Sequence, residues 1–443
     1  KGDFSMIMGY PGSTDRYVNS DGVKLAVDVQ EPAQVKVRGA KLDAMKRHMD
    51  ADPVVKIKYS AKYNEIANYW KYFIGQQKEL KDQHVAEKKQ AQETQLMAWV
   101  DSDPVIKARY GELATDLSSG YAERAKTEKA SVYMEEGAFG SEAVLMGFNL
   151  YGLQMQLDQD PKDTAGISAY VARIKRSTAD HWKDYDVATD RDLTASVFQM
   201  IHADVDPAQQ PDIMQMVAKK YKGNFDKWAA AMFKTSILTD STRLTDFLAH
   251  PSAKVIDKDM GMQTMLSCLD LYNDVLGPAR DEAQAKIDRG YRLLVSAMQM
   301  MDPNKMWYPN ANSTMRLTYG QIKGYAPRDA VYYEYFTTQK GILQKEDDAN
   351  PEFVVPKRER AMLVDRDFGR YANADGNLPI CFLSDNDITG GNSGSPVINA
   401  NGELIGLAFD GNWESMSGDI SFDPALNRTI CVDIRYVLWV IDK

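Results

Sequence analysis

Residues 389–397 read Thr389-Gly390-Gly391-Asn392-Ser393-Gly394-Ser395-Pro396-Val397. A serine hydroxyl is a poor nucleophile unless a tight loop presents it to a base and aims backbone N–H groups at the developing oxyanion. The glycines around Ser393 permit such a loop, because glycine tolerates positive φ angles and close backbone approach. Gly391 lies two residues before Ser393, so their backbone amides can converge on one oxygen atom. The run therefore predicts Ser393 as a nucleophile and Gly391 as part of an oxyanion hole.

The alternative interpretation is a Gly/Ser-rich surface turn, which a bare Gly-x-Ser-Gly match would favour. A hairpin pattern directly after the run argues for the nucleophile. Residues 397–398 and 404–409 are apolar, and Asn399-Ala400-Asn401-Gly402 supplies turn residues between them. The serine loop and the hairpin together are typical of a trypsin-like serine peptidase with two β-barrels.

Further strand patterns lie near both ends of the chain. In residues 4–10, large apolar side chains occupy every second position, which indicates a half-buried strand. Segments 315–322 and 330–336 are rich in aromatic and β-branched residues and are expected to be strands. Another strand is expected at 378–383, immediately before the serine loop.

The segment from about Glu31 to Pro303 has an almost wholly helical pattern. Ala, Lys, Glu, Gln, Met and Leu dominate it, and apolar residues recur at spacings of three and four. A helix is also expected at the C-terminus, with Asp433 as its cap. The apolar stripe of that helix consists of Ile434, Val437, Leu438 and Ile441.

The expected fold is α+β and multidomain: a chymotrypsin-like double β-barrel, only partly present, interrupted by a large all-α domain. Residues 1–30 are expected to end the first part of the barrel domain. Residues 31–303 are then the inserted helical cap domain, and residues 304–443 the C-terminal barrel part with the serine loop and the final helix. Because the chain begins at Lys1 inside a strand pattern, we expect its natural N-terminus to lie upstream.

The composition of the 443 residues is that of an ordinary globular protein, with a net charge of -10. This charge argues against a nucleic-acid-binding surface and gives no support to a polybasic membrane patch. No apolar run approaches the roughly 20 residues that a membrane span needs. Neither His-Glu-x-x-His nor Cys-x-x-Cys occurs, so no metal or cofactor is expected. Of the three cysteines, Cys381 and Cys431 can pair or remain free thiols, and Cys268 completes the set.

Four groups of residues spread along the chain resemble one known family. They are Met8-Gly9-Tyr10-Pro11-Gly12-Ser13-Thr14, Ala67-Asn68-Tyr69-Trp70-Lys71, residues 386–396, and Phe409-Asp410-Gly411-Asn412-Trp413-Glu414. The family is that of the bacterial serine dipeptidyl-peptidases of the dipeptidyl-peptidase 7 and 11 type, and the chain resembles the dipeptidyl-peptidase 7 branch most. The resemblance implies a chymotrypsin-like double barrel interrupted by a helical domain, which agrees with the division expected from the residue patterns.

The resemblance implies an exopeptidase that removes dipeptides from a free peptide N-terminus, with Ser393 as nucleophile and Gly391 lending an oxyanion N–H. Asn68 and Asp410 match the family residues that hold the substrate's α-amino group. A carboxylate with an amide acceptor is the set that a free ammonium selects in a partly desolvated site. Without the motifs, Asn68 is a polar residue on an exposed helix face and Asp410 a carboxylate in a turn.

Gly411 follows Ser393 by 18 residues, on the strand expected to wall the primary specificity pocket. The acidic-specific branch of the family carries an arginine at the matching position. Glycine there implies an open, uncharged pocket and a preference for hydrophobic residues before the scissile bond. The preference should be broad, because one apolar group discriminates by only about 1–3 kcal/mol. The alternative is that Gly411 merely permits a strand bulge.

A trypsin-like enzyme also needs a histidine base and an orienting aspartate, in the chain order His, Asp, Ser. All five histidines lie in helical patterns, and each is expected to be an ordinary helix residue: His48, His84, His181, His202 and His250. Asp3 directly precedes a segment that in the family follows the catalytic aspartate by several strands. We therefore expect the catalytic His and Asp upstream of Lys1, and an incomplete triad in this chain alone.

The leading hypothesis is a serine exopeptidase that releases N-terminal dipeptides. The alternatives are a trypsin-like endopeptidase, which would also cleave N-terminally blocked peptides, and a non-catalytic peptide-binding fragment. The family resemblance further implies peptide substrates with a free N-terminus, a homodimer, and a periplasmic or cell-surface location in a Gram-negative bacterium. No nucleic acid and no membrane span are expected.

Overall fold

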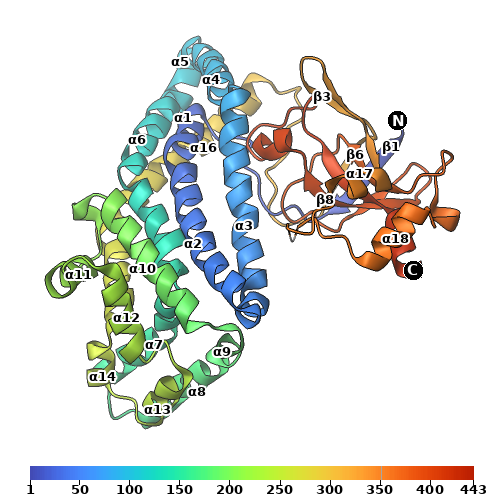
Figure 1. Cartoon of the computed structure of the whole chain (residues 1–443). Helices are drawn as coiled ribbons and strands as arrows, with labels where there is room; N and C mark the ends of the chain where they lie inside the picture. The colour runs from blue at the N-terminus through green and yellow to red at the C-terminus, as the bar shows by residue number, and fades with distance from the viewer. Residues whose placement is uncertain (351) are drawn as a thin grey trace. The chain divides into compact units, whose positions relative to one another are not determined.

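The computed structural model describes residues 1–350 and 352–443, which form two compact units (Figure 1). The β-unit comprises Lys1–Val18, Lys78–Glu87 and Asp302–Lys443. The helical unit comprises Asn19–Gln77 and Lys88–Met301. Helices α3 (Pro53–Asp82) and α4 (Val85–Asp101) each run from one unit into the other along the chain.

The β-unit is built on a seven-stranded antiparallel sheet with the strand order β2-β1-β7-β8-β9-β6-β5. Its strands are β1 (Phe4–Gly9), β2 (Arg316–Gln321), β5 (Phe336–Thr338), β6 (Pro379–Ser384), β7 (Pro396–Ile398), β8 (Leu404–Gly411) and β9 (Thr429–Asp433). A separate two-stranded ribbon consists of β3 (Tyr325–Arg328) and β4 (Val331–Tyr333). Within the sheet, Met6 of β1 lies opposite Tyr319 on one side and Ile398 on the other. The two ends of the chain therefore form one sheet.

The strands expected from the residue patterns are present, with one change. The segment 330–336, expected as a single strand, is divided between β4 and β5. The chain bends at Tyr335, whose carbonyl accepts the backbone N–H of Leu383 at 2.7 Å, and Phe336 then pairs with Phe382. Val331–Tyr333 pairs instead with β3. Because both halves are equally rich in aromatic residues, composition alone does not reveal the bend.

The C-terminal helix α19 (Ile434–Asp442) begins as expected, with the Asp433 side chain accepting the N–H of Arg435 at 2.9 Å. Its expected apolar stripe is wrong, since Leu438 and Ile441 are 43% and 73% exposed. The helix buries Trp439 instead, at 1% exposure. The indole Nε1 donates to Asp367 O at 2.9 Å, so one large ring fixes the face that packs inward.

The remaining helices are divided between the helical unit and the β-unit. In the helical unit they are α1 (Ser20–Leu25), α2 (Glu31–Ala51), α5 (Pro104–Tyr110), α6 (Leu113–Val132), α7 (Glu142–Gln159), α8 (Thr164–Thr178), α9 (His181–Asp184), α10 (Val187–Asp204), α11 (Ile213–Tyr221), α12 (Phe225–Thr235), α13 (Ser241–Ala249), α14 (Ala253–Lys258), α15 (Met260–Asp270) and α16 (Gly277–Met301). In the β-unit they are α17 (Gln339–Lys345) and α18 (Lys357–Asp365). The core of the helical unit includes the fully buried Phe198, Trp228 and Leu150.

The boundaries of the compact units differ from the expected domains 1–30, 31–303 and 304–443. Helix formation starts at Ser20, because the side chain of Asn19 accepts the N–H of Gly22 at 3.1 Å and caps α1. Residues 78–87 group with the β-unit although they lie inside the expected helical domain. The described strands form one sheet and one ribbon. The chymotrypsin-like double barrel stays a prediction.

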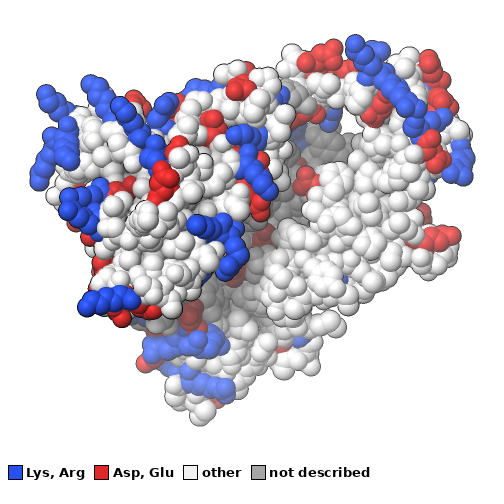
Figure 2. Space-filling model, turned by 90° about the horizontal axis from the view of Figure 1, so that it is seen from below, with Lys and Arg blue, Asp and Glu red and all other residues white. Residues whose placement is uncertain are grey.

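Charged side chains of both signs appear on the face that Figure 2 shows, so the net charge of -10 does not make that face uniformly acidic. Of the helices in residues 1–350 and 352–443, none combines the length and the hydropathy that a membrane span requires.

Candidate functional site

The loop between β6 and β7 carries the predicted nucleophile, and hydrogen bonds and an ion pair hold its first residues in place. Asn386 is 2% exposed, and its Oδ1 accepts the hydroxyl of Ser5 from β1 at 2.7 Å. The carbonyl of Asn386 accepts the hydroxyl of Thr429 from β9 at 2.7 Å. The next residue, Asp387, forms an ion pair with Arg16 at 2.8 Å. Strands from both ends of the chain therefore hold the start of the loop.

The glycines of this loop adopt conformations that other residues rarely reach. Gly391 has a φ of +104° and Gly394 a φ of +84°. A Cβ on Gly391 would lie 2.4 Å from Tyr10 O, so the loop passes directly against the segment that follows β1. Gly12 N donates to Gly390 O at 2.6 Å and joins the same two segments. Glycine is thus required at position 391 by both backbone angle and space, and at position 394 by backbone angle.

Ser393 is exposed, whereas its neighbours Asn392 and Ser395 are buried. Its Oγ donates to Phe409 O at 3.4 Å, which is a long hydrogen bond. Within the described part of the chain, the backbone N–H groups of Gly391 and Ser393 have no hydrogen-bond acceptor. An accessible hydroxyl beside unpaired amides is the arrangement that oxyanion stabilisation requires.

Asp410 and Gly411 end β8, next to a β-bulge in its pairing with β9. Asp410 is exposed, and its Oδ1 accepts the backbone N–H of Gly411 at 2.8 Å. A Cβ on Gly411 would lie 2.2 Å from Ser415 Oγ. That hydroxyl donates to Asn412 O at 2.6 Å. The Ser415 hydroxyl thus occupies the uncharged space next to the Gly411 Cα, and the open pocket expected at Gly411 stays a prediction.

Asn68 lies on α3 within the helical unit, and its side chain is exposed. Two residues later, Trp70 Nε1 donates to Val35 O at 3.0 Å and holds this part of α3 against α2. Asp410, its expected partner at a substrate amino group, belongs to the β-unit. Their joint role stays a prediction.

A model of the peptidase S46 family matches residues 1–443, which is the whole chain. The chain belongs to the peptidase S46 family. This confirms the family that the four groups of residues resembled.

Two curated relatives of this S46 chain show how far the likeness extends. Dipeptidyl-peptidase 7 of Porphyromonas endodontalis is 40% identical over 454 residues, covering 100% of this chain and 53% of the relative. The Asp/Glu-specific dipeptidyl-peptidase of Porphyromonas gingivalis is 34% identical over 447 residues, covering 100% of this chain and 61% of the relative. The chain thus spans between 53% and 61% of the length of these two proteins.

Solved structures give the same result for the fold. The crystal structure of Porphyromonas endodontalis DPP11 in complex with the dipeptide Arg-Glu superimposes with a TM-score of 0.89 at 31% identity. The match covers 100% of this chain and 63% of that chain. The S46 chain therefore shares the fold of that part of DPP11.

Three histidines of this S46 chain lie on helices as expected: His48, His181 and His202. His84 instead occupies the turn between α3 and α4 with a φ of +52°, and His250 follows the last residue of α13. His48 Nε2 lies 2.8 Å from Asp192 Oδ2 and joins α2 to α10, a pair that the sequence did not reveal. Burial lowers the pKa of His181. His84 is the one histidine of the β-unit, and among the residues described there it forms no hydrogen bond with Ser393.

The three cysteines are free thiols in the structure. Cys381 and Cys431 lie on the neighbouring strands β6 and β9, where Cys381 pairs with Val432 and Phe382 with Cys431. Burial raises the pKa of Cys381 to about 11 and that of Cys431 to about 12. Both groups are therefore protonated near neutral pH.

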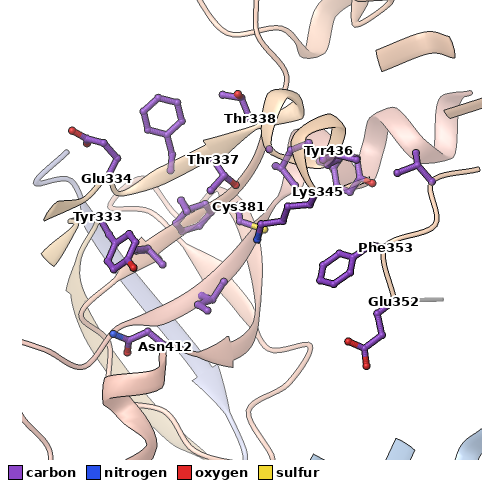
Figure 3. A pocket seen from close by; sticks show the side chains of 18 of the residues that line it. Tyr333, Glu334, Thr337, Thr338, Lys345, Glu352, Phe353, Cys381, Asn412 and Tyr436 are labelled. Atoms are coloured by element: carbon purple, nitrogen blue, oxygen red, sulfur yellow. The ribbon is translucent and has the colours of Figure 1, made fainter. Parts of the chain in front are cut away.

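A cavity of about 690 Å³ lies beside β5, at the edge of the sheet (Figure 3). Its lining is largely apolar and includes Phe336, Ile342 and Phe353, with Lys345 and Cys381 close to each other. None of the five candidate site residues is among the described residues that line it.

In residues 1–350 and 352–443, no group of His, Cys, Asp or Glu side chains is placed to hold a metal ion.

Proposed function

We propose that this chain carries the nucleophile of a serine exopeptidase that releases N-terminal dipeptides from peptides. The observation that carries the proposal is the accessible Ser393 hydroxyl beside the unpaired N–H groups of Gly391 and Ser393. Membership of peptidase S46, and relatives named dipeptidyl-peptidases, support it. In this proposal the seven-stranded sheet belongs to the second half of a chymotrypsin-like double barrel.

The proposed reaction begins with attack of Ser393 Oγ on the carbonyl carbon of the second substrate residue. The N–H groups of Gly391 and Ser393 stabilise the oxyanion that forms, and the leaving peptide departs to give an acyl-enzyme that water hydrolyses. A base must take the Ser393 proton in the first step. In the proposal, the histidine base and its aspartate come from polypeptide outside this chain, because no β-unit histidine among the described residues is hydrogen-bonded to Ser393.

Recognition of the free substrate N-terminus is assigned to Asp410 and Asn68. Asp410 Oδ1 is held by the Gly411 N–H at 2.8 Å, which fixes the carboxylate and leaves Oδ2 for an ammonium group. The exposed Asn68 amide supplies a neutral acceptor. An acylated N-terminus has neither the charge nor the donors for this site, so blocked peptides should be poor substrates.

The preference for hydrophobic residues before the scissile bond is assigned to the surroundings of Gly411. Besides Ser415, the methyl group of Met416 lies 3.7 Å from the position of a Cβ on Gly411. The Ser415 hydroxyl and the Met416 methyl form an uncharged wall, which supplies no positive charge to pair with a carboxylate side chain. The selectivity among apolar residues should stay within about 1–3 kcal/mol.

The test uses the complete gene product with a free-amine Xaa-Leu chromogenic dipeptide and its N-acetylated twin. We expect turnover of the free-amine substrate, little turnover of the blocked one, and loss of turnover in Ser393→Ala. Ser118→Ala, an exposed serine on α6, is the matched control and should keep full activity. Full activity of Ser393→Ala would show that the nucleophile assignment is wrong.

Two alternatives give different outcomes in the same assay. A trypsin-like endopeptidase would cleave the blocked twin as well as the free-amine substrate. A non-catalytic peptide-binding fragment would bind peptides without turnover, and the hydrogen bond of Ser393 Oγ to Phe409 O rather than to a base favours it for the chain by itself.

The proposal also includes a homodimer and a periplasmic or cell-surface location, both of which rest on the family resemblance alone. Analytical ultracentrifugation of the gene product and fractionation of the source cells test them separately. A monomer, or a protein confined to the cytoplasmic fraction, would remove these parts of the proposal without affecting the chemistry assigned to Ser393.

A further inference from the structure

Asn392 is buried at 2% exposure directly before the exposed Ser393. A buried amide destabilises the fold unless its polar atoms are hydrogen-bonded. Here the Asn392 Oδ1 accepts the N–H of Thr389 at 3.2 Å, and the Asn392 N–H donates to Thr389 O at 3.1 Å. On the other side, Asn392 O accepts the N–H of Ser395 at 2.9 Å. Asn392 therefore closes the loop on both sides of Ser393.

Gly9, the last residue of β1, makes room for this packing. A Cβ on Gly9 would lie 2.5 Å from Asn392 Nδ2 and 2.3 Å from Ser395 Oγ. The backbone of Gly9 is fixed in the sheet, where it pairs with Arg316 of β2. Because Gly9 is not among the glycines with positive φ, a side chain is excluded there by space and not by backbone conformation.

We propose that Asn392 is a positioning residue for the nucleophile, seated against Gly9 so that the Ser393 hydroxyl and amide face the substrate. The inference rests on the proposed function, in which Ser393 attacks the peptide. Asn392 is buried, so it acts through the backbone of Ser393 and does not touch the substrate. The strand β1 thereby becomes part of the catalytic arrangement without contributing a reacting group.

The buried position of Asn392 favours a neutral amide over a charged side chain. Asn392 offers an acceptor to the N–H of Thr389 and a donor, Nδ2, beside Gly9. Within the described residues, no Lys, Arg or His forms an ion pair or hydrogen bond with its side chain. A carboxylate of the same shape would be buried without a counter-ion, which is strongly unfavourable. Asn392→Asp is therefore expected to impair the loop although it preserves the acceptor.

The experiment measures kcat and KM of the complete gene product for the free-amine chromogenic dipeptide. The variants are Asn392→Ala, Gly9→Ala and the double variant; the control is Asn399→Ala, which removes a capping side chain from the β7–β8 turn. Each single variant should lower kcat on the order of 100-fold, the effect of a displaced reacting group. KM should change by less than about twofold, because ground-state binding is not removed. The double variant should lose little more than either single one, since both disturb the same contact.

The possible outcomes distinguish failure of the positioning role of Asn392 from failure of the proposed function. A kcat for Asn392→Ala equal to that of Asn399→Ala, or losses that multiply in the double variant, would overturn the positioning role. Active Ser393→Ala would overturn the nucleophile assignment itself, whereas inactive Ser393→Ala with fully active Asn392→Ala overturns the positioning role alone. If Gly9→Ala does not yield folded protein, the comparison of Asn392→Ala with Asn399→Ala decides the question.

Discussion

Arg16 and Asp387 form an ion pair at 2.8 Å in which the Arg16 side chain is 9% exposed and the Asp387 side chain 38%. The pair joins the segment after β1 to the loop that leads to Ser393. Replacement of Asp387 by Ala leaves a mostly buried guanidinium without this carboxylate. We expect the free energy of unfolding to fall by about 1–3 kcal/mol, as measured by urea denaturation. The fully exposed pair of Asp180 and Lys183 supplies the control, and Asp180→Ala should change little. Equal effects of the two substitutions would contradict the expected role.

The contact between Gly411 and Ser415 predicts a pair of compensating substitutions. Gly411→Ala places a Cβ 2.2 Å from Ser415 Oγ, so either the strand end or the Ser415 side chain must move. We expect Gly411→Ala to lower both the melting temperature and kcat/KM. Gly411→Ala combined with Ser415→Ala should recover most of the loss, because the nearest remaining atom, Ser415 Cβ, lies at 3.4 Å. Thermal denaturation and the chromogenic assay check this, and additive losses would count against it.

Asp190 predicts a pH dependence of stability in the helical unit. Burial, followed by the charge of Glu142, raises the pKa of Asp190 to about 7, although the N–H groups of Ala143 and Glu142 oppose the shift. In the unfolded chain the value is about 3.9. Between these values the folded protein keeps a proton that the unfolded chain has lost, so the free energy of unfolding falls as pH rises from about 4 to about 7.

Asp190→Asn isolates this contribution, because it keeps the shape and removes the titration. Urea denaturation at several pH values should show a flatter slope for the variant over this window, by up to about 1.4 kcal/mol per pH unit. The variant should also be less stable overall, since the Asp190 carboxylate accepts the N–H groups of Glu142 at 2.9 Å and Ala143 at 2.8 Å. Identical slopes would show that Asp190 does not titrate in this window.

The half-buried thiol of Cys381 and the buried thiol of Cys431 predict a slow reaction with alkylating reagents. Because burial raises the pKa of Cys381 to about 11 and of Cys431 to about 12, little thiolate is present at pH 8. We expect mass spectrometry to show far slower labelling by iodoacetamide in the native protein than in denaturant, and no change of melting temperature on addition of a reductant. Failure of both cysteines to label in denaturant without reductant would indicate a disulfide instead.

The sequence revealed features whose cause is local. A nucleophile loop needs glycine at particular backbone angles, and Gly391 and Gly394 have the positive φ that their positions implied. The cap at Asp433 and the strands around the serine loop follow from short patterns of the same kind. Residue type and spacing are enough to predict a feature when it depends on the conformation of a few consecutive residues.

Features that depend on packing were missed. Trp439 and not the regular apolar stripe fixes the inward face of α19, because a fully buried indole outweighs smaller side chains at helical spacing. The Ser415 hydroxyl fills the space beside Gly411, and no local pattern places a side chain of the following turn there. The pair of His48 and Asp192 joins residues far apart in the sequence, so their meeting depends on how α2 packs against α10.

The position of β1 in the sheet has a consequence for biosynthesis. Its partners β2 and β7 begin at Arg316 and Pro396, so the ribosome must make about 300 further residues before β1 finds a neighbour. At ordinary elongation rates this interval lasts on the order of tens of seconds. The intervening helical unit, whose contacts are made within its own segment, can fold during that time, whereas β1 must wait as an unpaired strand. The sheet that carries the loop of Ser393 therefore cannot form until β7, β8 and β9 have been made, hundreds of residues after β1.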